Sequence, residues 1–256
     1  MSKNNDQPDA EILAQFLLPE RAERLAQVLE KRTSSLTIVL DHVQNYHNIS
    51  AVLRSADAFG LAQVHVIGKE FDFSRRIALG TERWLRIYAH QSASAAAQYL
   101  HQQDFRVVVL QPEEHKITGT DAAKMPVTSL PFEERLALVF GNEKDGVSRE
   151  LLAAADVHAY IPMAGFVESL NISVACAICL FCSTIAPTFP QKRTKPLCEE
   201  EKRDLRAEWL RNGVKRSEVI LREVALRKEW PASITDSEAF CQPAKRRALT
   251  SSEPKD

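Results

Sequence analysis

The sequence is poor in several features that mark large classes of protein. Its 256 residues contain only 8 glycines. They form neither a Gly-x-Gly-x-x-Gly turn nor a phosphate loop ending in Gly-Lys-Ser/Thr, which argues against dinucleotide and nucleoside-triphosphate enzymes. No apolar run approaches the roughly 20 residues that a membrane-spanning helix needs. Residues 1–10 are polar and acidic, unlike a secretory signal. We therefore expect no membrane partner.

Cysteine usage points to the compartment. The 5 cysteines are an odd number, and three of them, Cys176, Cys179 and Cys182, lie on one apolar segment. This distribution argues against a disulfide framework and favours a reducing, cytoplasmic location. The cysteine spacing is that of some metal ligands, but no histidine cluster accompanies it. We therefore expect small buried thiols and no metal site.

The net charge of -1 conceals a gradient along the chain. Residues 191–256 carry 16 Lys and Arg against 12 Asp and Glu, whereas residues 34–190 carry 12 against 16. The basic end is either a local patch for a polyanionic partner or a solvated helical face, and charge alone leaves both open. With 45% apolar and 26% charged residues, the composition is that of a soluble globular protein.

Short apolar runs alternate with helical patterns along most of the chain, which predicts an α/β fold with a mostly parallel sheet covered by helices on both faces. The expected strands are residues 36–40, 64–68, 84–89, 105–111, 136–141 and 157–162. The expected helices are residues 9–18, 20–32, 49–59, 74–80, 92–103, 149–155, 174–184, 199–212 and 216–229, with Asn48 and Ser173 as candidate N-caps.

The same patterns divide the chain. We expect a helical N-terminal extension (1–33), a core (34–190), a C-terminal helical extension (191–230) and a disordered tail (231–256), where Ser, Pro and charged residues dominate.

Three short motifs carry the functional information. Asn48 is followed six residues later by Arg54, residues 141–146 read GNEKDG after a strand, and Ser169-Leu170-Asn171 precedes a buried helix. Taken singly, each has an ordinary interpretation: a helix cap with a surface arginine, a turn, and a helix start. The carboxyl ends of strands are also where open α/β sheets bind ligands.

In combination, N-x5-R, FGNEKDGVS and IPMAGFVESLNIS resemble, in order and spacing, the motifs of the SpoU/TrmH-like branch of the SPOUT RNA 2′-O-methyltransferases. The resemblance runs from about residue 20 to about residue 230, and the flanking helices are similar to those of the tRNA guanosine-2′-O-methyltransferases. Many members have a proline before the motif asparagine, where this chain has Tyr46-His47. The resemblance implies a C-terminal trefoil knot that holds S-adenosyl-L-methionine, and a homodimer whose active sites are completed across the interface.

The resemblance also implies roles for individual residues. Arg54 is expected to grip a phosphate and to hydrogen-bond the developing alkoxide, because a guanidinium is a poor base. The other expected catalytic-site residues are Asn48 and Glu143, which order the site, Glu143 by orienting Arg54 or Asn171, and Ser169 and Asn171, which shape the loop. The expected cofactor contacts are Leu110, Gly141, Ile161 and Leu170, and the expected RNA contacts are Arg24, Lys31, Arg32, Lys192, Arg193 and Lys195.

The expected reaction is methylation of a ribose 2′-hydroxyl in tRNA, at the D-loop guanosine at position 18 by resemblance. Two alternatives stay open. One is the same chemistry on ribosomal RNA, and the other is a non-catalytic RNA-binding protein on the same fold.

Overall fold

The computed structural model describes residues 6–68, 80–114, 123–184 and 194–227. Its contacts divide the chain into two compact units, Met1–Ser217 and Glu218–Asp256. The predicted helix 74–80 and the predicted tail 231–256 lie outside the described residues.

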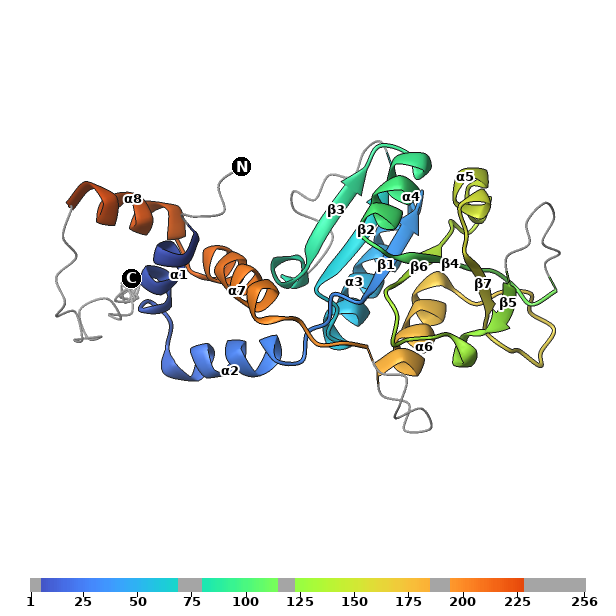
Figure 1. Cartoon of the computed structure of the whole chain (residues 1–256), viewed down its shortest axis with the longest axis horizontal. Helices are drawn as coiled ribbons and strands as arrows, with labels where there is room; N and C mark the ends of the chain where they lie inside the picture. The colour runs from blue at the N-terminus through green and yellow to red at the C-terminus, as the bar shows by residue number, and fades with distance from the viewer. Residues whose placement is uncertain (1–5, 69–79, 115–122, 185–193, 228–256) are drawn as a thin grey trace, which may run out of the picture. The chain divides into compact units, whose positions relative to one another are not determined.

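Seven parallel strands form one sheet in the order β3-β2-β1-β6-β4-β7-β5 (Figure 1). The strands are β1 (Leu36–Asp41), β2 (Gln63–Ile67), β3 (Arg86–His90), β4 (Arg106–Leu110), β5 (Ala123–Pro126), β6 (Leu136–Phe140) and β7 (Val157–Tyr160). Six of them are the predicted strands, with bounds that differ by two residues at most. The sequence analysis missed β5, whose lysine and proline are unlike a central strand but are tolerated at the edge of a sheet.

Helices cover both faces of the sheet, as predicted. On one face α3 (Tyr46–Ala58) and α6 (Ile172–Thr184) pack over alternate strand residues such as Ile38. On the other face α4 (Ala93–Gln102) and α5 (Arg149–Ala153) pack over the intervening residues such as Val39. The alternation explains why the central strands read as continuous apolar runs, because both of their faces are buried.

Both predicted N-caps are displaced. The cap of α3 is Asn45, whose side chain accepts from the amides of His47 and Asn48, so Asn48 lies inside the helix. At the start of α6, Asn171 Oδ1 accepts from the backbone N–H of Ser173 at 2.9 Å, so Asn171 acts as the cap in place of Ser173. Each helix therefore begins two to three residues earlier than predicted, because the chain offers two cap-forming side chains close together.

The predicted flanking helices are present. They are α1 (Asp6–Ala14), α2 (Pro19–Leu29), α7 (Glu199–Gly213) and α8 (Ser217–Arg227), with short 3₁₀ turns η1 (Thr81–Trp84) and η2 (Val127–Ser129). Helix α7 packs against α1, α2 and η1. Among the described helices, none is both long and apolar enough to cross a membrane.

Candidate active site

A cavity of about 370 Å³ opens at the carboxyl ends of β4, β6 and β7. Pockets of roughly 300–1,000 Å³ hold small molecules, and this edge of a parallel sheet is their usual position. All four predicted cofactor contacts line the cavity: Leu110, Gly141, Ile161 and Leu170. The predicted site residues Glu143 and Ser169 line it as well.

The turn after β6 makes one wall of this cavity and explains Gly141. Asn142 and Gly146 exchange backbone hydrogen bonds of 3.1 Å, and Asn142 Oδ1 accepts from the amides of Lys144 and Asp145. The turn therefore folds back onto its own start. A Cβ on Gly141 would lie 2.1 Å from the carbonyl carbon of Gly146, so only glycine fits here.

The three motifs meet at Asn48. Its Nδ2 donates to Glu143 Oε1, and its Oδ1 accepts from Asn171 Nδ2 at 3.2 Å. Asn48 is 9% exposed, so both polar ends of its amide are satisfied in a buried position. The hydrogen-bond partner of Glu143 is Asn48, which in turn contacts Asn171, so Glu143 reaches Asn171 through Asn48.

Arg54 lies apart from this network. It is exposed on α3, and among the described residues it has no hydrogen-bond or ion-pair partner. It is absent from the cavity lining. Close to it in sequence, Ala51 and Ser55 line a second, open groove between α3 and α6, whose other residues are Ser173, Val174, Ala177, Ile178 and Phe181.

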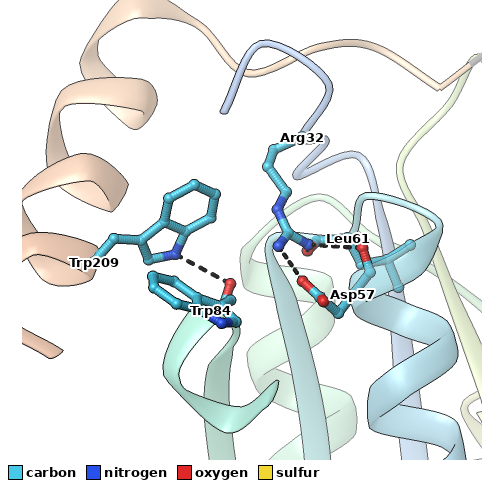
Figure 2. A network of polar contacts seen from close by, with 5 residues as sticks. All are labelled: Arg32, Asp57, Leu61, Trp84 and Trp209. Carbon is cyan, nitrogen blue, oxygen red and sulfur yellow. Dashed lines mark hydrogen bonds and ion pairs between the residues drawn. The ribbon is translucent and has the colours of Figure 1, made fainter. Parts of the chain in front are cut away.

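The buried position of Arg32 contradicts the prediction that this residue contacts RNA. Its guanidinium pairs with the carboxylate of Asp57, donates to Leu61 O at 2.6 Å, and lies 5.0 Å from the ring centre of Trp209. Figure 2 shows the side chain pointing into this network, where Trp209 Nε1 donates to Trp84 O at 3.1 Å. Only 1% of Arg32 is exposed, and burial lowers its pKa although Asp57 opposes the shift. Arg32 is therefore part of the fold and does not face solvent.

The other predicted basic residues divide into two sets. Arg24, Lys31 and Lys195 are exposed, as an RNA contact requires. Lys192 and Arg193 lie outside the described residues.

Sequence reasoning missed Asp41, the last residue of β1. It is 1% exposed, and its two carboxylate oxygens accept from His42 Nδ1 at 2.7 Å and from the backbone N–H of Ser148 at 2.6 Å. A carboxylate at the end of an otherwise apolar strand is the signal that would have indicated it, because a buried charge needs dedicated partners.

Two of the three cysteines of α6 are buried core residues, as predicted, whereas Cys182 is only partly buried. Cys176 and Cys179 are fully buried, and burial raises the pKa of both thiols. Within the ranges that the structure describes, no group of three or more His, Cys, Asp or Glu side chains is arranged to hold a metal ion.

Comparison with known proteins shows which family the chain resembles. Residues 35–181 match the model of the SpoU rRNA Methylase family. A tRNA (guanosine(18)-2′-O)-methyltransferase of Borreliella burgdorferi is 32% identical over 211 residues, which are 82% of this chain and 93% of that relative. The 23S rRNA (guanosine-2′-O-)-methyltransferase RlmB of Xylella fastidiosa is 36% identical over 152 residues, 57% of each chain. The crystal structure of the A. aeolicus TrmH/SpoU tRNA modifying enzyme matches with a TM-score of 0.63 and 29% identity, over 76% of this chain and 97% of that one.

Proposed function

We propose that this chain, which belongs to the SpoU rRNA Methylase family, transfers a methyl group from S-adenosyl-L-methionine to a ribose 2′-hydroxyl of tRNA. The proposed acceptor is the guanosine at position 18, as in the name of the Borreliella burgdorferi relative. The single observation that carries the proposal is the meeting of the three motifs at Asn48 beside a cavity of about 370 Å³.

The cavity fits the proposed cofactor. Leu110, Ile161 and Leu170 offer flat apolar walls for an adenine ring, and Gly141 lets the main chain approach a ligand closely. When bound, S-adenosyl-L-methionine supplies an activated methyl group on a sulfonium. The protein contributes position, which provides roughly 7–11 kcal/mol of a barrier in well-aligned reactions.

Arg54 is proposed as the residue that meets the RNA. A ribose hydroxyl becomes a good nucleophile only when its proton leaves or is shared. A guanidinium stays protonated at neutral pH, so Arg54 acts by gripping the adjacent phosphate and donating a hydrogen bond to the developing alkoxide. Asn48, Glu143 and Asn171 hold the loops around this position, and Ser169 forms part of the rim of the cavity.

The exposed apolar groove beside Arg54 favours a homodimer. Val174 and Phe181, which line the groove between α3 and α6, are 47% and 49% exposed, although this face is almost wholly apolar. Such a face is typical of a subunit interface. We propose that a second copy covers the groove and that Arg54 serves the cavity of the partner. Replacing Phe181 with glutamate is then expected to give monomers in analytical ultracentrifugation with unchanged cofactor affinity. A variant that stays dimeric would remove this groove from the interface.

The trefoil knot is part of the proposal. Strand β6 lies between β1 and β4, and β4 lies between β6 and β7, so no two consecutive strands from β4 to β7 are neighbours in the sheet, which supports a threaded connection. A crystal structure with S-adenosylhomocysteine tests it. We expect a threaded backbone in the C-terminal part of the core, with the ligand against Ile161 and Leu170. An unthreaded chain would disprove the knot.

The proposed RNA-binding surface consists of Arg24, Lys31 and Lys195, which are exposed, together with Lys192 and Arg193. Arg32 is excluded from it by its burial. A cytoplasmic location is proposed with the tRNA substrate.

Two measurements test the proposed function. Isothermal titration with S-adenosyl-L-methionine is expected to show one site per chain. Mapping of 2′-O-methyl groups in total RNA, with and without this protein, tests the reaction itself. Without the protein, one guanosine in tRNA D-loops is expected to lack its 2′-O-methyl group. Loss of a position in 23S rRNA would favour the ribosomal alternative, for which the Xylella fastidiosa relative is the specific observation. An unchanged map with intact RNA binding would identify a non-catalytic binding protein.

A further inference from the structure

Asp41 is a buried charge that the proposed reaction does not use. It ends β1, where it lies opposite Ile67 of β2, and only 1% of it is exposed. A buried carboxylate is costly unless hydrogen bonds compensate for its lost water. The position of these bonds therefore shows what the residue is for.

The hydrogen bond to Ser148 joins two loops that are distant in sequence. Ser148 lies 107 residues after Asp41 and donates its backbone N–H at 2.6 Å. It directly follows Gly146 and Val147, which line the cavity. The other carboxylate oxygen lies 2.7 Å from His42 Nδ1. The backbone of His42 is in the left-handed region, with φ 52°.

The loop from Gly141 to Ser148 is thereby attached to the β1–α3 region at two points. Near its tip, Glu143 accepts from Asn48, and at its end, Ser148 donates to Asp41. Between these two points lie Asp145, Gly146 and Val147, all of which line the cavity. Asn48 is a predicted site residue, whereas Asp41 has no role in the proposed chemistry.

We propose that Asp41 is a positioning residue, which holds the 141–148 loop against the cavity and thereby sets its affinity for S-adenosyl-L-methionine. This inference rests on the proposed function. The carboxylate is suited to the task because a charged acceptor binds a backbone N–H more strongly than a neutral one does. It acts through the loop and touches no reacting atom.

The experiment compares four variants of the full chain: Asp41→Ala, Asp41→Asn, His42→Ala and Ser148→Ala. We expect Asp41→Ala to raise the Kd for S-adenosyl-L-methionine about tenfold, the equivalent of one lost hydrogen bond. The Kd for tRNA is expected to stay within about twofold, because the proposed RNA contacts Lys31 and Lys195 lie near the start of β1, whereas Asp41 ends that strand. Asp41→Asn keeps an acceptor oxygen and is expected to restore part of the affinity.

Two variants serve as matched controls. His42→Ala removes the other bond of the same carboxylate and leaves the bond to Ser148. Ser148→Ala removes a hydroxyl and leaves the backbone N–H that Asp41 binds. Both are expected to bind S-adenosyl-L-methionine within about twofold of the unchanged protein. A loss in His42→Ala as large as that in Asp41→Ala would overturn the assignment to the Ser148 bond.

Amide hydrogen exchange gives a readout that does not depend on activity. Residues 141–148 are expected to exchange faster in Asp41→Ala than in the unchanged chain, with no difference in β1 itself. A Kd within twofold together with unchanged exchange would overturn the inference and leave the proposed function intact. If Asp41→Ala does not fold, Asp41→Asn decides the matter by the same two measurements. If the unchanged chain binds no S-adenosyl-L-methionine, the proposed function fails, and the role of Asp41 in setting that affinity is overturned with it.

Discussion

Two arginines near the same helix have opposite environments. Arg32, before β1, is buried against Asp57 at the end of α3, while Arg54 stands exposed on α3 three residues before Asp57. Both read as basic surface residues in the sequence. The comparison shows that a cation held by an ion pair and a buried carbonyl stabilises structure, whereas one left in solvent remains available for a ligand.

The largest effect is expected at the exposed arginine. Arg54→Ala is expected to lower turnover by a factor on the order of 10²–10³, as is usual when one donor to a developing oxyanion is removed. Thermal stability and cofactor affinity are expected to remain unchanged, because Arg54 makes no hydrogen bond or ion pair among the described residues. The measurement is methyl transfer to tRNA at saturating substrates. Arg106→Ala, at the start of β4, is the control and is expected to keep its turnover. Equal turnover of the two variants would contradict the proposed role of Arg54.

Arg32→Ala is expected to act on stability instead. Removing Arg32 costs about 1–3 kcal/mol, because the buried Leu61 carbonyl and the Asp57 carboxylate, which is 33% exposed, lose their partner. Urea unfolding is expected to show this loss, while the folded fraction keeps its affinity for tRNA. Arg32→Lys retains the charge but lacks the planar fork, so it is expected to recover only part of the stability. A drop in tRNA affinity with unchanged unfolding would make Arg32 an RNA contact after all.

The exposed basic residues provide the opposite case. Replacing Arg24, Lys31 and Lys195 together with glutamine is expected to leave stability unchanged and to weaken tRNA binding. If each contacts one phosphate, the slope of log affinity against log salt falls by about 2–3. Filter binding at several salt concentrations measures it. This triple variant is preferable to deletion of residues 191–256, which would also remove Trp209 from the Arg32 network. An unchanged slope would show that these residues do not contact tRNA phosphates and serve solubility instead.

A buried imidazole, whose effect is absent at neutral pH, extends the comparison to a titratable group. His65 is fully buried, and burial, together with the nearby His90, lowers its pKa from 6.5 to about 3. The unfolded chain therefore takes up a proton first as the pH falls. The contribution of neutral His65 to the free energy of unfolding is full above pH 6.5. It falls toward pH 3 by at most about 1.4 kcal/mol per pH unit. Urea unfolding between pH 4 and 7 measures this slope, which His65→Phe is expected to flatten. An equal slope in both proteins would show that other groups dominate.

Local pattern predicted the elements of this fold well and their ends poorly. The strands from β1 to β7, except β5, were predicted from short β-rich runs, and the signal is clearest in β1 and β6, where every residue is buried. The helix starts were wrong because neighbouring side chains compete for the same amides: Asn45 prevailed over Asn48, and Asn171 over Ser173. Because Asn48 lies inside α3 and does not cap it, its amide is available to link Glu143 with Asn171.

The sequence by itself determined the α/β class, the order of the strands along the chain and the three motifs, whose resemblance to a family pointed to four residues of the cavity lining. These follow from short-range periodicity and from motif spacing, both of which are local. The tertiary structure decided which basic side chains reach solvent, which asparagine joins the motifs, and that Asp41 holds a loop 107 residues away. The physical reason is that burial and hydrogen-bond partnership depend on which segments the fold brings together, and a guanidinium or carboxylate takes its role from those neighbours.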